Sequence, residues 1–450
     1  MPLAADIIDR TMDSKEGGAG YDVVSILTDA GHEAWWVGGG VRDMLLGKIP
    51  KDIDIATSAK PGEVSALFPK SDDSAAALGA VVVSHKGVRF EITTFREEDA
   101  VSDGRHPESV RFATRERDSV RRDLTMNAVY WQPVSQELFD PHGGERDAKE
   151  RLVRFIGDPG ERMRHDALRM LRAVRFRALL SGQYHPDTYR ALQENAALAG
   201  SLSGSRQLAE FEKMLLGPNV DRALEDLWET GILKYTIPEL YACKGVAQPK
   251  EYHAEGDVWN HTRRLAGSFT DDHGLDIRVA AVFHDCGKVL TFSVKERIRF
   301  DHHAQVSADV TRAVLSRMQM PSKRSEKICW LIAHHMMMAT FFTIGEERKA
   351  HWYHHPWFSE LLQLFWLDIA GTEPSDFEMY DRIIDDYNAF LDSHPRPKKP
   401  LLSGGEIMEL LGIGPGEEVG RILKSLHDEQ IAKRITKKAE AREFLLRHKA

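Results

Sequence analysis

The 450-residue chain is too long for one ordinary hydrophobic core, which indicates two to four domains. Its content of 42% hydrophobic and 29% charged residues is typical of a water-soluble globular protein, and no apolar run approaches the roughly 18 residues of a membrane span. The net charge of −9 excludes a protein that coats nucleic acid through overall positive charge, so an RNA partner would require a local basic surface. Three scattered cysteines and an N-terminus without a secretory pattern indicate neither a disulfide framework nor export, so we expect a cytoplasmic protein without a membrane partner.

The first 150 residues alternate glycine-rich turns with short runs of β-branched and aromatic residues. Runs of this kind are typical of strands bounded by turns. The predicted strands lie within residues 34–40, 52–57, 79–85, 90–95 and 128–131.

The remainder of the chain has helical periodicity, which is clearest at 164–180 and 208–217. A histidine-rich helical stretch follows, and the Pro/Lys segment 393–400 predicts a linker before two short helices around a turn at 412–416. We therefore expect four parts, which are a head (1–150), a helical neck (151–235), a helical body (236–395) and a helical tail (396–450).

A pair of aspartates gives the first chemical signal. Asp52 and Asp54 are two residues apart in a predicted strand, so both carboxylates point to one face while Ile53 and Ile55 point to the other. Grouped carboxylates need a balancing cation, and they suit Mg²⁺, which prefers one or two carboxylates together with substrate phosphates. Glu91, on another predicted strand, is a candidate third catalytic carboxylate. The pattern predicts a magnesium site for phosphate chemistry, with a solvated strand edge as the alternative.

A glycine-rich turn precedes the aspartates, and its backbone N–H groups can approach phosphate oxygens closely. Residues 37–59 as a whole resemble the first motif of the class II tRNA nucleotidyltransferase and bacterial poly(A) polymerase family, which reads Gly-Gly-x-Val-Arg-Asp and then Asp-x-Asp. The resemblance implies that Asp52 and Asp54 bind metal. It also implies that the triphosphate and sugar are bound by Gly38, Gly39, Arg42 and Asp43.

Two further segments follow in the order of that family. Residues 121–128 resemble its RRDxTxNA motif, which implies contacts to the ribose and triphosphate for Arg122, Asp123 and Asn127. Residues 140–147 resemble its element between head and neck.

The helix predicted at 164–180 carries a candidate for base selection. Asp166, Arg169 and Arg172 are three residues apart and fall on one side of such a helix. Cytosine and adenine present an amine beside a ring nitrogen, so an aspartate can accept from the base and an arginine can donate to it, whereas uracil presents the reverse pattern. An intrahelical ion pair is the alternative for these residues alone. The segment resembles the family's Glu-Asp-x-x-Arg motif, with His165 in the place of the glutamate.

The resemblance leaves the exact product open. Residues 79–85 lack the Gly-Arg-Arg-Phe type segment of the family's poly(A) polymerases. The stretch 95–123 has about the full length of a flexible loop that is shortened in CC-adding relatives. These features favour CCA addition, ahead of addition of A alone and then of poly(A) or CC addition.

A second group of candidate ligands lies in the histidine-rich stretch. His284 and Asp285 are adjacent on a predicted apolar helix, where both can reach one metal ion. With their neighbours they resemble the HD phosphohydrolase superfamily, which uses histidines and aspartates to hold one or two divalent metals. The resemblance implies a set of ligands, which are His261, His284, Asp285 and Asp368, with His303 and His335 as additional candidates. It leaves open whether this domain hydrolyses phosphoesters, such as a 2′,3′-cyclic phosphate on damaged tRNA, or is a helical body that contacts tRNA.

We therefore expect an α+β protein with a small mixed-sheet nucleotidyltransferase head followed by an all-helical neck, HD body and tail. The expected reaction is in-line attack of the tRNA 3′-hydroxyl on the α-phosphate of CTP or ATP without a nucleic-acid template. The expected cofactors are Mg²⁺ in the head and a second divalent transition metal in the HD domain. The alternative of a different class is a metal-dependent phosphohydrolase whose head only binds RNA.

Overall fold

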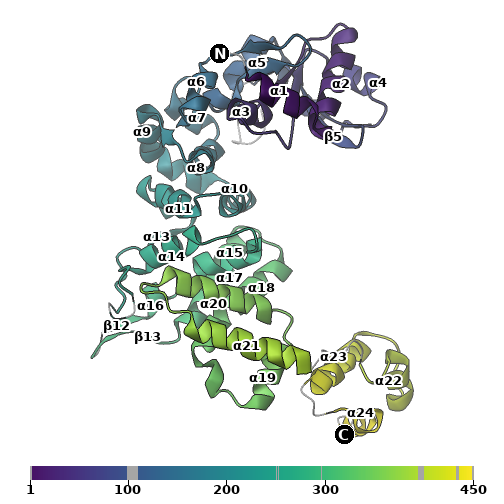
Figure 1. Ribbon diagram of the computed structural model, residues 1–450, viewed down its shortest axis with the longest axis vertical. Helices are drawn as coiled ribbons and strands as arrows, with labels where there is room; N and C mark the ends of the chain where they lie inside the picture. Colours follow the sequence, from purple (N-terminus) through teal and green to yellow (C-terminus); the bar gives the residue numbers. More distant parts are fainter. Residues whose placement is uncertain are drawn as a thin grey trace. The chain divides into compact units, whose positions relative to one another are not determined.

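The computed structural model describes residues 3–98, 110–249, 251, 253–294, 296–393, 400–431 and 435–447. The chain forms two compact units, Met1–Tyr241 and Ala242–Ala450, and each is described by itself (Figure 1). The finer boundaries at residues 150, 235 and 395 remain predictions. The middle of the predicted loop 95–123 and most of the predicted linker 393–400 lie outside the described residues.

A seven-stranded mixed sheet forms the head of the first unit. Its strand order is β3-β4-β5-β2-β1-β8-β9, in which β2 and β5 are parallel and the other neighbours are antiparallel. The strands are β1 (Ala34–Val37), β2 (Asp54–Thr57), β3 (Ser71–Asp72), β4 (Ala80–His85), β5 (Val88–Thr94), β8 (Tyr130–Gln132) and β9 (Glu137–Phe139). All five runs predicted as strands overlap one of these, and the α+β fold class is confirmed.

Helices cover one face of this sheet. Successive residues of a strand point to opposite faces, so only alternate side chains reach these helices. Trp36, Ile55 and Ile92 pack against the helices, whereas Trp35 and Ala56 belong to a smaller apolar cluster on the other face. The covering helices are α1 (Ala5–Met12), α2 (Lys15–Asp29), α3 (Gly39–Leu45) and α4 (Pro61–Leu67) (Figure 1). The other head elements are η1 (Ala76–Leu78), the ribbon of β6 (Arg96–Glu98) and β7 (Val110–Phe112), α5 (Arg115–Arg121), η2 (Thr125–Asn127) and α6 (Gly144–Lys149).

The helix predicted at 164–180 is interrupted. Helix α7 ends at His165 and α8 begins at Leu168, and between them Asp166 has an extended backbone with φ −149° and ψ 105°. The Asp166 side chain accepts a hydrogen bond from the backbone N–H of Leu168 at 3.1 Å, and such local side-chain bonds compete with continuous helix. Asp166 therefore does not share a helix with Arg169 and Arg172, and the prediction that it does is wrong.

The rest of the first unit is helical except for one short parallel pair, β10 (Leu152–Val153) with β11 (Gln183–Tyr184). The prediction of an all-helical neck is wrong in this detail. The helices are α7 (Pro159–His165), α8 (Leu168–Leu180), α9 (Pro186–Asn195), η3 (Ala196–Ser201), α10 (Gly204–Leu216), α11 (Val220–Glu229), α12 (Ile232–Thr236) and α13 (Pro238–Tyr241).

The second unit is mainly helical, with one hairpin of β12 (Phe292–Val294) and β13 (Ile298–Phe300) that the sequence did not predict. Helix α15 ends at Phe283, so His284 and Asp285 lie in the turn that follows it and not on the helix as predicted. The helices are α14 (Val258–Gly267), α15 (Leu275–Phe283), α16 (Lys288–Thr291), α17 (His303–Arg317), α18 (Ser322–His334), η4 (His335–Thr343), α19 (Glu346–Tyr353), α20 (Phe358–Gly371) and α21 (Glu378–Ser393).

The two helices predicted around the turn 412–416 are present as α22 (Gly404–Leu411) and α23 (Glu417–Ile431), and the described C-terminal residues form a further helix, α24 (Lys438–Arg447). Leu402, Ile407 and Leu445 belong to a small apolar core of their own.

Candidate functional site

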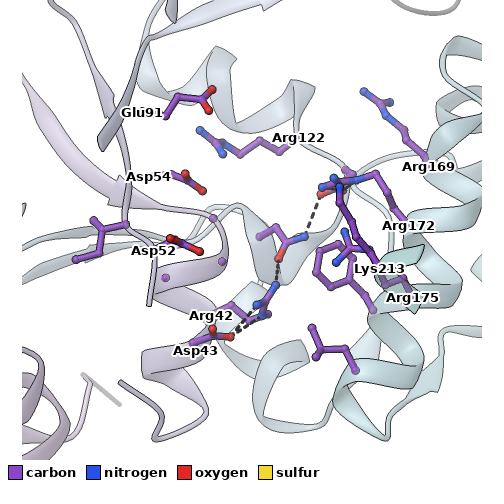
Figure 2. A pocket seen from close by; sticks show the side chains of 18 of the residues that line it. Arg42, Asp43, Asp52, Asp54, Glu91, Arg122, Arg169, Arg172, Arg175 and Lys213 are labelled. Carbon is purple, nitrogen blue, oxygen red and sulfur yellow. Dashed lines mark hydrogen bonds and ion pairs between the residues drawn. The ribbon is translucent and has the colours of Figure 1, made fainter. Parts of the chain in front are cut away.

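A large pocket lies within the first unit, lined by the head and by helices α7, α8 and α10 (Figure 2). Its volume is about 1200 Å³, and twelve lysines and arginines line it against six aspartates and glutamates. The pocket is thus basic in a chain of net charge −9, which is the local surface that a nucleotide or RNA ligand requires. All head and neck residues proposed from the motifs line it, namely Gly38, Gly39, Arg42, Asp43, Asp52, Asp54, Glu91, Arg122, Asp123, Asn127, Asp166, Arg169 and Arg172.

Three carboxylates come together at one side of the pocket, where Figure 2 shows Asp52, Asp54 and Glu91 directed into the same space. Strand β2 begins at Asp54, so Asp52 precedes the strand, contrary to the prediction. The alternation still holds, because Ile53 and Ile55 are buried while both aspartates are exposed to the pocket. Burial and the negative charge of Glu91 raise the pKa of Asp54 above its usual value. Mutually repelling carboxylates of this kind fit a divalent cation.

The glycine turn fits closely against these aspartates. Gly38 has φ +78°, and a Cβ atom there would lie 3.0 Å from Oδ2 of Asp54. A Cβ atom at Gly40 would lie 2.9 Å from the backbone oxygen of Asp52. The turn therefore needs glycine for its conformation and for its contact with the carboxylates.

A continuous polar chain crosses the pocket from head to neck (Figure 2). Arg42, which is buried, donates to Asp43 at 2.7 Å and to Oδ1 of Asn127 at 3.1 Å. Asn127 donates to Oδ1 of Asp123 at 3.2 Å, and Oδ2 of Asp123 accepts from Nη2 of Arg172 at 2.6 Å. Burial opposes the charge of Asp123, but Arg172 lowers its pKa to about 2. The motif residues are thus held in fixed positions before any ligand binds.

Asp118 anchors the two arginines of the RRD motif, and sequence reasoning missed it. It is fully buried and accepts from Arg121 at 2.7 Å, from Arg122 at 3.0 Å and from the Tyr130 hydroxyl at 2.6 Å. Although burial opposes ionisation, Arg122 and Arg121 hold the pKa of Asp118 below its usual value. Asp118 precedes the two arginines by three and four residues, a spacing that brings side chains together on a helix such as α5 and was a usable signal.

Asp166 and Arg169, the two residues predicted to contact the base, bind other partners within the protein and not each other. Oδ1 of Asp166 accepts from Nη2 of Arg206 on α10 at 2.8 Å. Arg169 donates to the backbone oxygens of Arg121 at 3.2 Å and Arg162 at 3.4 Å. The intrahelical ion pair considered from the sequence is therefore absent from the described residues. His165, in the place of the family's glutamate, also lines the pocket.

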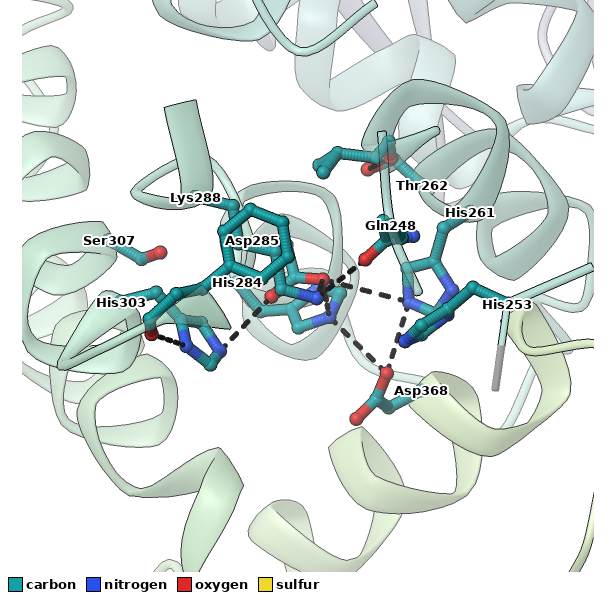
Figure 3. Close-up of polar contacts among 12 residues, drawn as sticks. Gln248, His253, His261, Thr262, His284, Asp285, Lys288, His303, Ser307 and Asp368 are labelled. Atoms are coloured by element: carbon teal, nitrogen blue, oxygen red, sulfur yellow. Dashed lines mark hydrogen bonds and ion pairs between the residues drawn. The ribbon is translucent and has the colours of Figure 1, made fainter. Parts of the chain in front are cut away.

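In the second unit, the six side chains proposed from the sequence as HD ligands converge: His261, His284, Asp285, His303, His335 and Asp368. Figure 3 labels all of these except His335. Oδ1 of Asp368 lies 3.0 Å from Nε2 of His261 and 3.4 Å from Nε2 of His284. Oδ2 of Asp285 lies 3.3 Å from Nε2 of His284, while its Oδ1 lies 3.4 Å from Nε2 of His303 and 3.9 Å from Nε2 of His335. The two oxygens of Asp285 thus face different histidines, Oδ2 facing His284 and Oδ1 facing His303 and His335.

Hydrogen bonds from the Nδ1 atoms fix the orientation of three histidine rings, so that their Nε2 atoms face the proposed metal site. Nδ1 donates to backbone oxygens from His284 at 2.8 Å, from His303 at 2.9 Å and from His335 at 2.7 Å. Because a carbonyl oxygen only accepts, the Nδ1 atoms carry protons, and the Nε2 atoms of these rings face the carboxylates. Nε2 of His261, Nε2 of His284 and both oxygens of Asp285 are buried, and among the described residues none of them makes a hydrogen bond of regular geometry, although Nζ of Lys288 lies 2.7 Å from Oδ2 of Asp285. A divalent ion fits such a donor set.

The electrostatics of this centre agree with its geometry. Burial opposes a charge on His284, but Asp285 raises its pKa to about 10. Despite burial, the neighbouring histidines hold the pKa values of Asp285 and Asp368 well below the usual range. The centre thus stabilises a positive charge at His284 next to two ionised carboxylates, while burial lowers the pKa values of His303 and His335.

Polar residues that the sequence did not suggest surround these ligands. Glu255 accepts from Nδ1 of His261 at 3.2 Å and lies 2.7 Å from Nδ1 of His253. Nζ of Lys288 lies 2.7 Å from Oδ2 of Asp285 and donates to Gln248 at 2.7 Å. Only Lys288, three residues after Asp285, stands close enough in sequence to be suggested by spacing.

Three family models match the chain. Residues 34–154 match the poly A polymerase head domain, and residues 183–243 match the probable RNA and SrmB-binding site of polymerase A. Residues 257–349 match the HD domain.

Among curated relatives, the CCA-adding enzyme of Geobacillus stearothermophilus is 45% identical over 214 residues, which cover 47% of this chain and 53% of that protein. The CCA-adding enzyme of Pediococcus pentosaceus is 42% identical over 214 residues, which cover 47% of this chain and 54% of that protein. The chain spans about half the length of the curated relatives it matches.

The similarity to solved structures extends over the whole chain. A Bacillus stearothermophilus CCA-adding enzyme in complex with CTP has 28% identity and a TM-score of 0.66, and covers 97% of this chain and 98% of its own. The chain thus contains regions that match the poly A polymerase head domain and the HD domain, and it is similar over 97% of its length to a CCA-adding enzyme. A Thermotoga maritima CCA-adding enzyme complexed with tRNA, at 18% identity and a TM-score of 0.58 over 100% of this chain and 98% of its own, shares the fold.

The similarity to the poly A polymerase head domain and to CCA-adding enzymes implies a divalent metal cofactor. The carboxylates beside Gly38 and the histidines and carboxylates around Asp285 are both of suitable chemistry for such an ion. In the described part of the chain, no helix combines the length and the hydropathy that a membrane span needs.

Proposed function

We propose that this protein adds CMP and AMP to the 3′ end of tRNA without a nucleic-acid template. The observation that carries the proposal is the convergence of three carboxylates and an arginine-rich wall in one pocket of a chain that is similar to a CCA-adding enzyme over 97% of its length. With it we propose the division into head (1–150), neck (151–235), HD body (236–395) and tail (396–450), and action in the cytoplasm, where the three buried cysteines stay reduced.

In the proposed reaction, the tRNA 3′-oxygen forms a bond to the α-phosphorus of CTP or ATP, the bond from that phosphorus to the bridging oxygen breaks, and pyrophosphate leaves. Asp52 and Asp54 would hold Mg²⁺, with Glu91 beside them, and the ion supplies charge neutralisation and activation of the attacking hydroxyl. The protein's own contribution is mainly positioning and charge stabilisation.

The pocket residues have separate tasks in this proposal. Arg42 and Arg122 bind the triphosphate, because guanidinium groups pair well with phosphate oxygens. Asp43, Asp123 and Asn127 contact the sugar and hold the arginines, and the Gly38–Gly39 turn lets the backbone approach the phosphates.

Base choice falls to Asp166 and Arg169 in the same proposal. The carboxylate accepts from the exocyclic amine of cytosine or adenine, and the guanidinium donates to the adjacent ring nitrogen. Uracil would place a carbonyl oxygen, an acceptor, against the carboxylate and a ring N–H, a donor, against the guanidinium. Such mismatches in a partly buried site discriminate strongly against UTP. Arg172 supports the site through its ion pair with Asp123.

The test is the product formed from labelled CTP and ATP with three tRNAs that end before CCA, after C or after CC. Completion of all three ends supports CCA addition. Use of ATP only on the tRNA ending in CC would indicate an A-adding enzyme, and long A tails would indicate a poly(A) polymerase. Arrest after CC would indicate a CC-adding enzyme, and no incorporation at all would refute the nucleotidyl-transfer proposal.

A second candidate function is metal-dependent phosphoester hydrolysis in the HD domain. The convergence of the buried Nε2 atoms of His261 and His284 on the carboxylates of Asp285 and Asp368 favours it, because a body that only contacts RNA has no need of such a cluster. Asp368, His303 and His335 complete the proposed ligands for a divalent transition metal. The test is hydrolysis of 2′,3′-cyclic nucleotides with added Mn²⁺, Ni²⁺ or Zn²⁺ by the wild type and by Asp285→Asn. Equal rates in both proteins would refute this activity.

A further inference from the structure

The carboxylate of Asp166 uses its two oxygens unequally. Oδ1 accepts two hydrogen bonds, from the backbone N–H of Leu168 at 3.1 Å and from Nη2 of Arg206 at 2.8 Å. Among the described residues, no hydrogen bond reaches Oδ2. One oxygen is thus bound to the protein, and the other remains available to a ligand in the pocket that Asp166 lines.

Arg206 reaches Asp166 from a different part of the chain. It lies on α10, forty residues after Asp166, and the two side chains are 19% and 26% exposed. An ion pair that is mostly withdrawn from water is stronger than one on the surface and restricts rotation of the carboxylate about its Cβ–Cγ bond. Glu210 on the same helix accepts from Nε of Arg175 at 2.7 Å. Helix α10 therefore supports the pocket wall at two points, Asp166 and Arg175.

The donor of the base-selecting pair is fixed by other contacts. The guanidinium of Arg169 is bound to the backbone oxygens of Arg121 and Arg162, of which the first belongs to the RRD segment of the head. Acceptor and donor are therefore oriented separately, one by α10 and the other by the head.

We propose that Arg206 is a specificity-determining positioning residue that fixes Asp166, so that Oδ2 accepts the exocyclic amine of cytosine or adenine. The inference rests on the proposed function, in which Asp166 reads the base. Uracil and guanine carry a carbonyl oxygen where cytosine and adenine carry the amine, and two acceptors repel each other. Without Arg206 the carboxylate rotates and either oxygen takes the bond from Leu168, so the acceptor loses its fixed direction.

The test compares Arg206→Gln with the wild type by measuring the dissociation constants of CTP and UTP in Mg²⁺ and the kcat and KM of single-nucleotide incorporation. We expect the CTP-to-UTP preference to fall about ten-fold, through weaker CTP binding, because a charge-assisted hydrogen bond is removed. Arg190→Gln is the matched control, since Arg190 is 65% exposed and pairs with Asp187 outside the pocket. An unchanged preference in Arg206→Gln overturns the proposal, as does an equal loss in the control.

A double-mutant cycle separates positioning from general support of the fold. If Arg206 acts through Asp166, Arg206→Gln adds no further loss of preference to Asp166→Asn, whereas independent effects would multiply and overturn the proposal. Arg206→Lys keeps the charge but not the planar fork, and we expect it to lose less preference than glutamine. The lysine variant serves in place of the glutamine variant if the latter does not fold.

Binding and turnover distinguish this inference from the proposed function. A wild-type protein that prefers CTP in binding but extends no tRNA would refute the proposed nucleotidyl transfer, while the binding ratio in Arg206→Gln would still decide the role of Arg206. A wild-type protein that binds CTP and UTP equally would overturn the role of Arg206 directly.

Discussion

Replacing Asp123 by asparagine removes one charge of the ion pair that joins the head to helix α8. Asp123 is 9% exposed, and its carboxylate lies 2.6 Å from Nη2 of Arg172. Its pKa is lowered from the usual 3.8 to about 2, by the charge of Arg172 against the effect of burial. At about 1.4 kcal/mol for each pKa unit, the ionised carboxylate stabilises the folded state by about 2 kcal/mol at pH 7.

The sign of the pH dependence follows from the direction of the shift. Because the folded pKa lies below that of the unfolded chain, the stabilisation is complete above about pH 4 and disappears as the pH falls toward about 2. For a unit of this size, 1 kcal/mol corresponds to about 2–4 °C, so Asp123→Asn should lower the melting temperature of the first unit by about 4–8 °C at pH 7. At pH 3 the difference should be about half as large.

Differential scanning calorimetry of the wild type and Asp123→Asn at pH 7 and pH 3 measures this directly. Asp187→Asn is the control, since its side chain is 57% exposed and such surface pairs contribute less than about 1 kcal/mol. A destabilisation of the same size at both pH values would refute the electrostatic reasoning, because the loss of stability would then not depend on the charge of Asp123. No destabilisation at pH 7 would refute the role of the ion pair itself.

Three further substitutions test the positioning of the two sites. Gly38→Ala should lower CTP incorporation at least about ten-fold, because a Cβ atom at φ +78° would lie 3.0 Å from Oδ2 of Asp54; normal incorporation would mean that the turn moves without displacing the carboxylate. Asp118→Asn should raise the KM for CTP about ten-fold, because it weakens the buried anchor of the two RRD arginines, and an unchanged KM would contradict that anchoring role. Glu255→Gln should lower the affinity of the second unit for Mn²⁺ by about 10–100-fold in calorimetric titration, because the ring of His261 loses its ionised partner; equal affinities would exclude this contribution.

Local patterns predicted most of the head. The alternation around Asp54 marked strand β2, and the order of short motifs indicated residues that all line one pocket. Motifs succeed here because each one records a backbone turn and its side chains within a few residues. Contacts between distant segments leave no such record, so Arg206, which lies forty residues after Asp166 and meets it only through folding, could not be predicted from the sequence.

The errors in secondary structure also have local causes. Helical periodicity continued through Asp166 and through His284, yet both stand at helix ends. Asp166 bonds the N–H of Leu168 with its own side chain, and His284 bonds the backbone oxygen of Ala281. Such side-chain bonds compete with the helix, and a hydrophobic pattern does not register them. Both breaks occur at proposed functional residues, where local rules most often yield to function.

The most direct test of the account is Mg²⁺-dependent incorporation of labelled CTP and ATP into tRNA that lacks its CCA end, measured for the wild type, Asp54→Asn and the exposed head control Asp72→Asn. We expect a completed CCA end for the wild type and the control. We expect a loss of about a thousand-fold or more for Asp54→Asn, because that carboxylate would hold the catalytic cation. Incorporation by a folded Asp54→Asn protein at a rate close to that of the wild type would contradict the account.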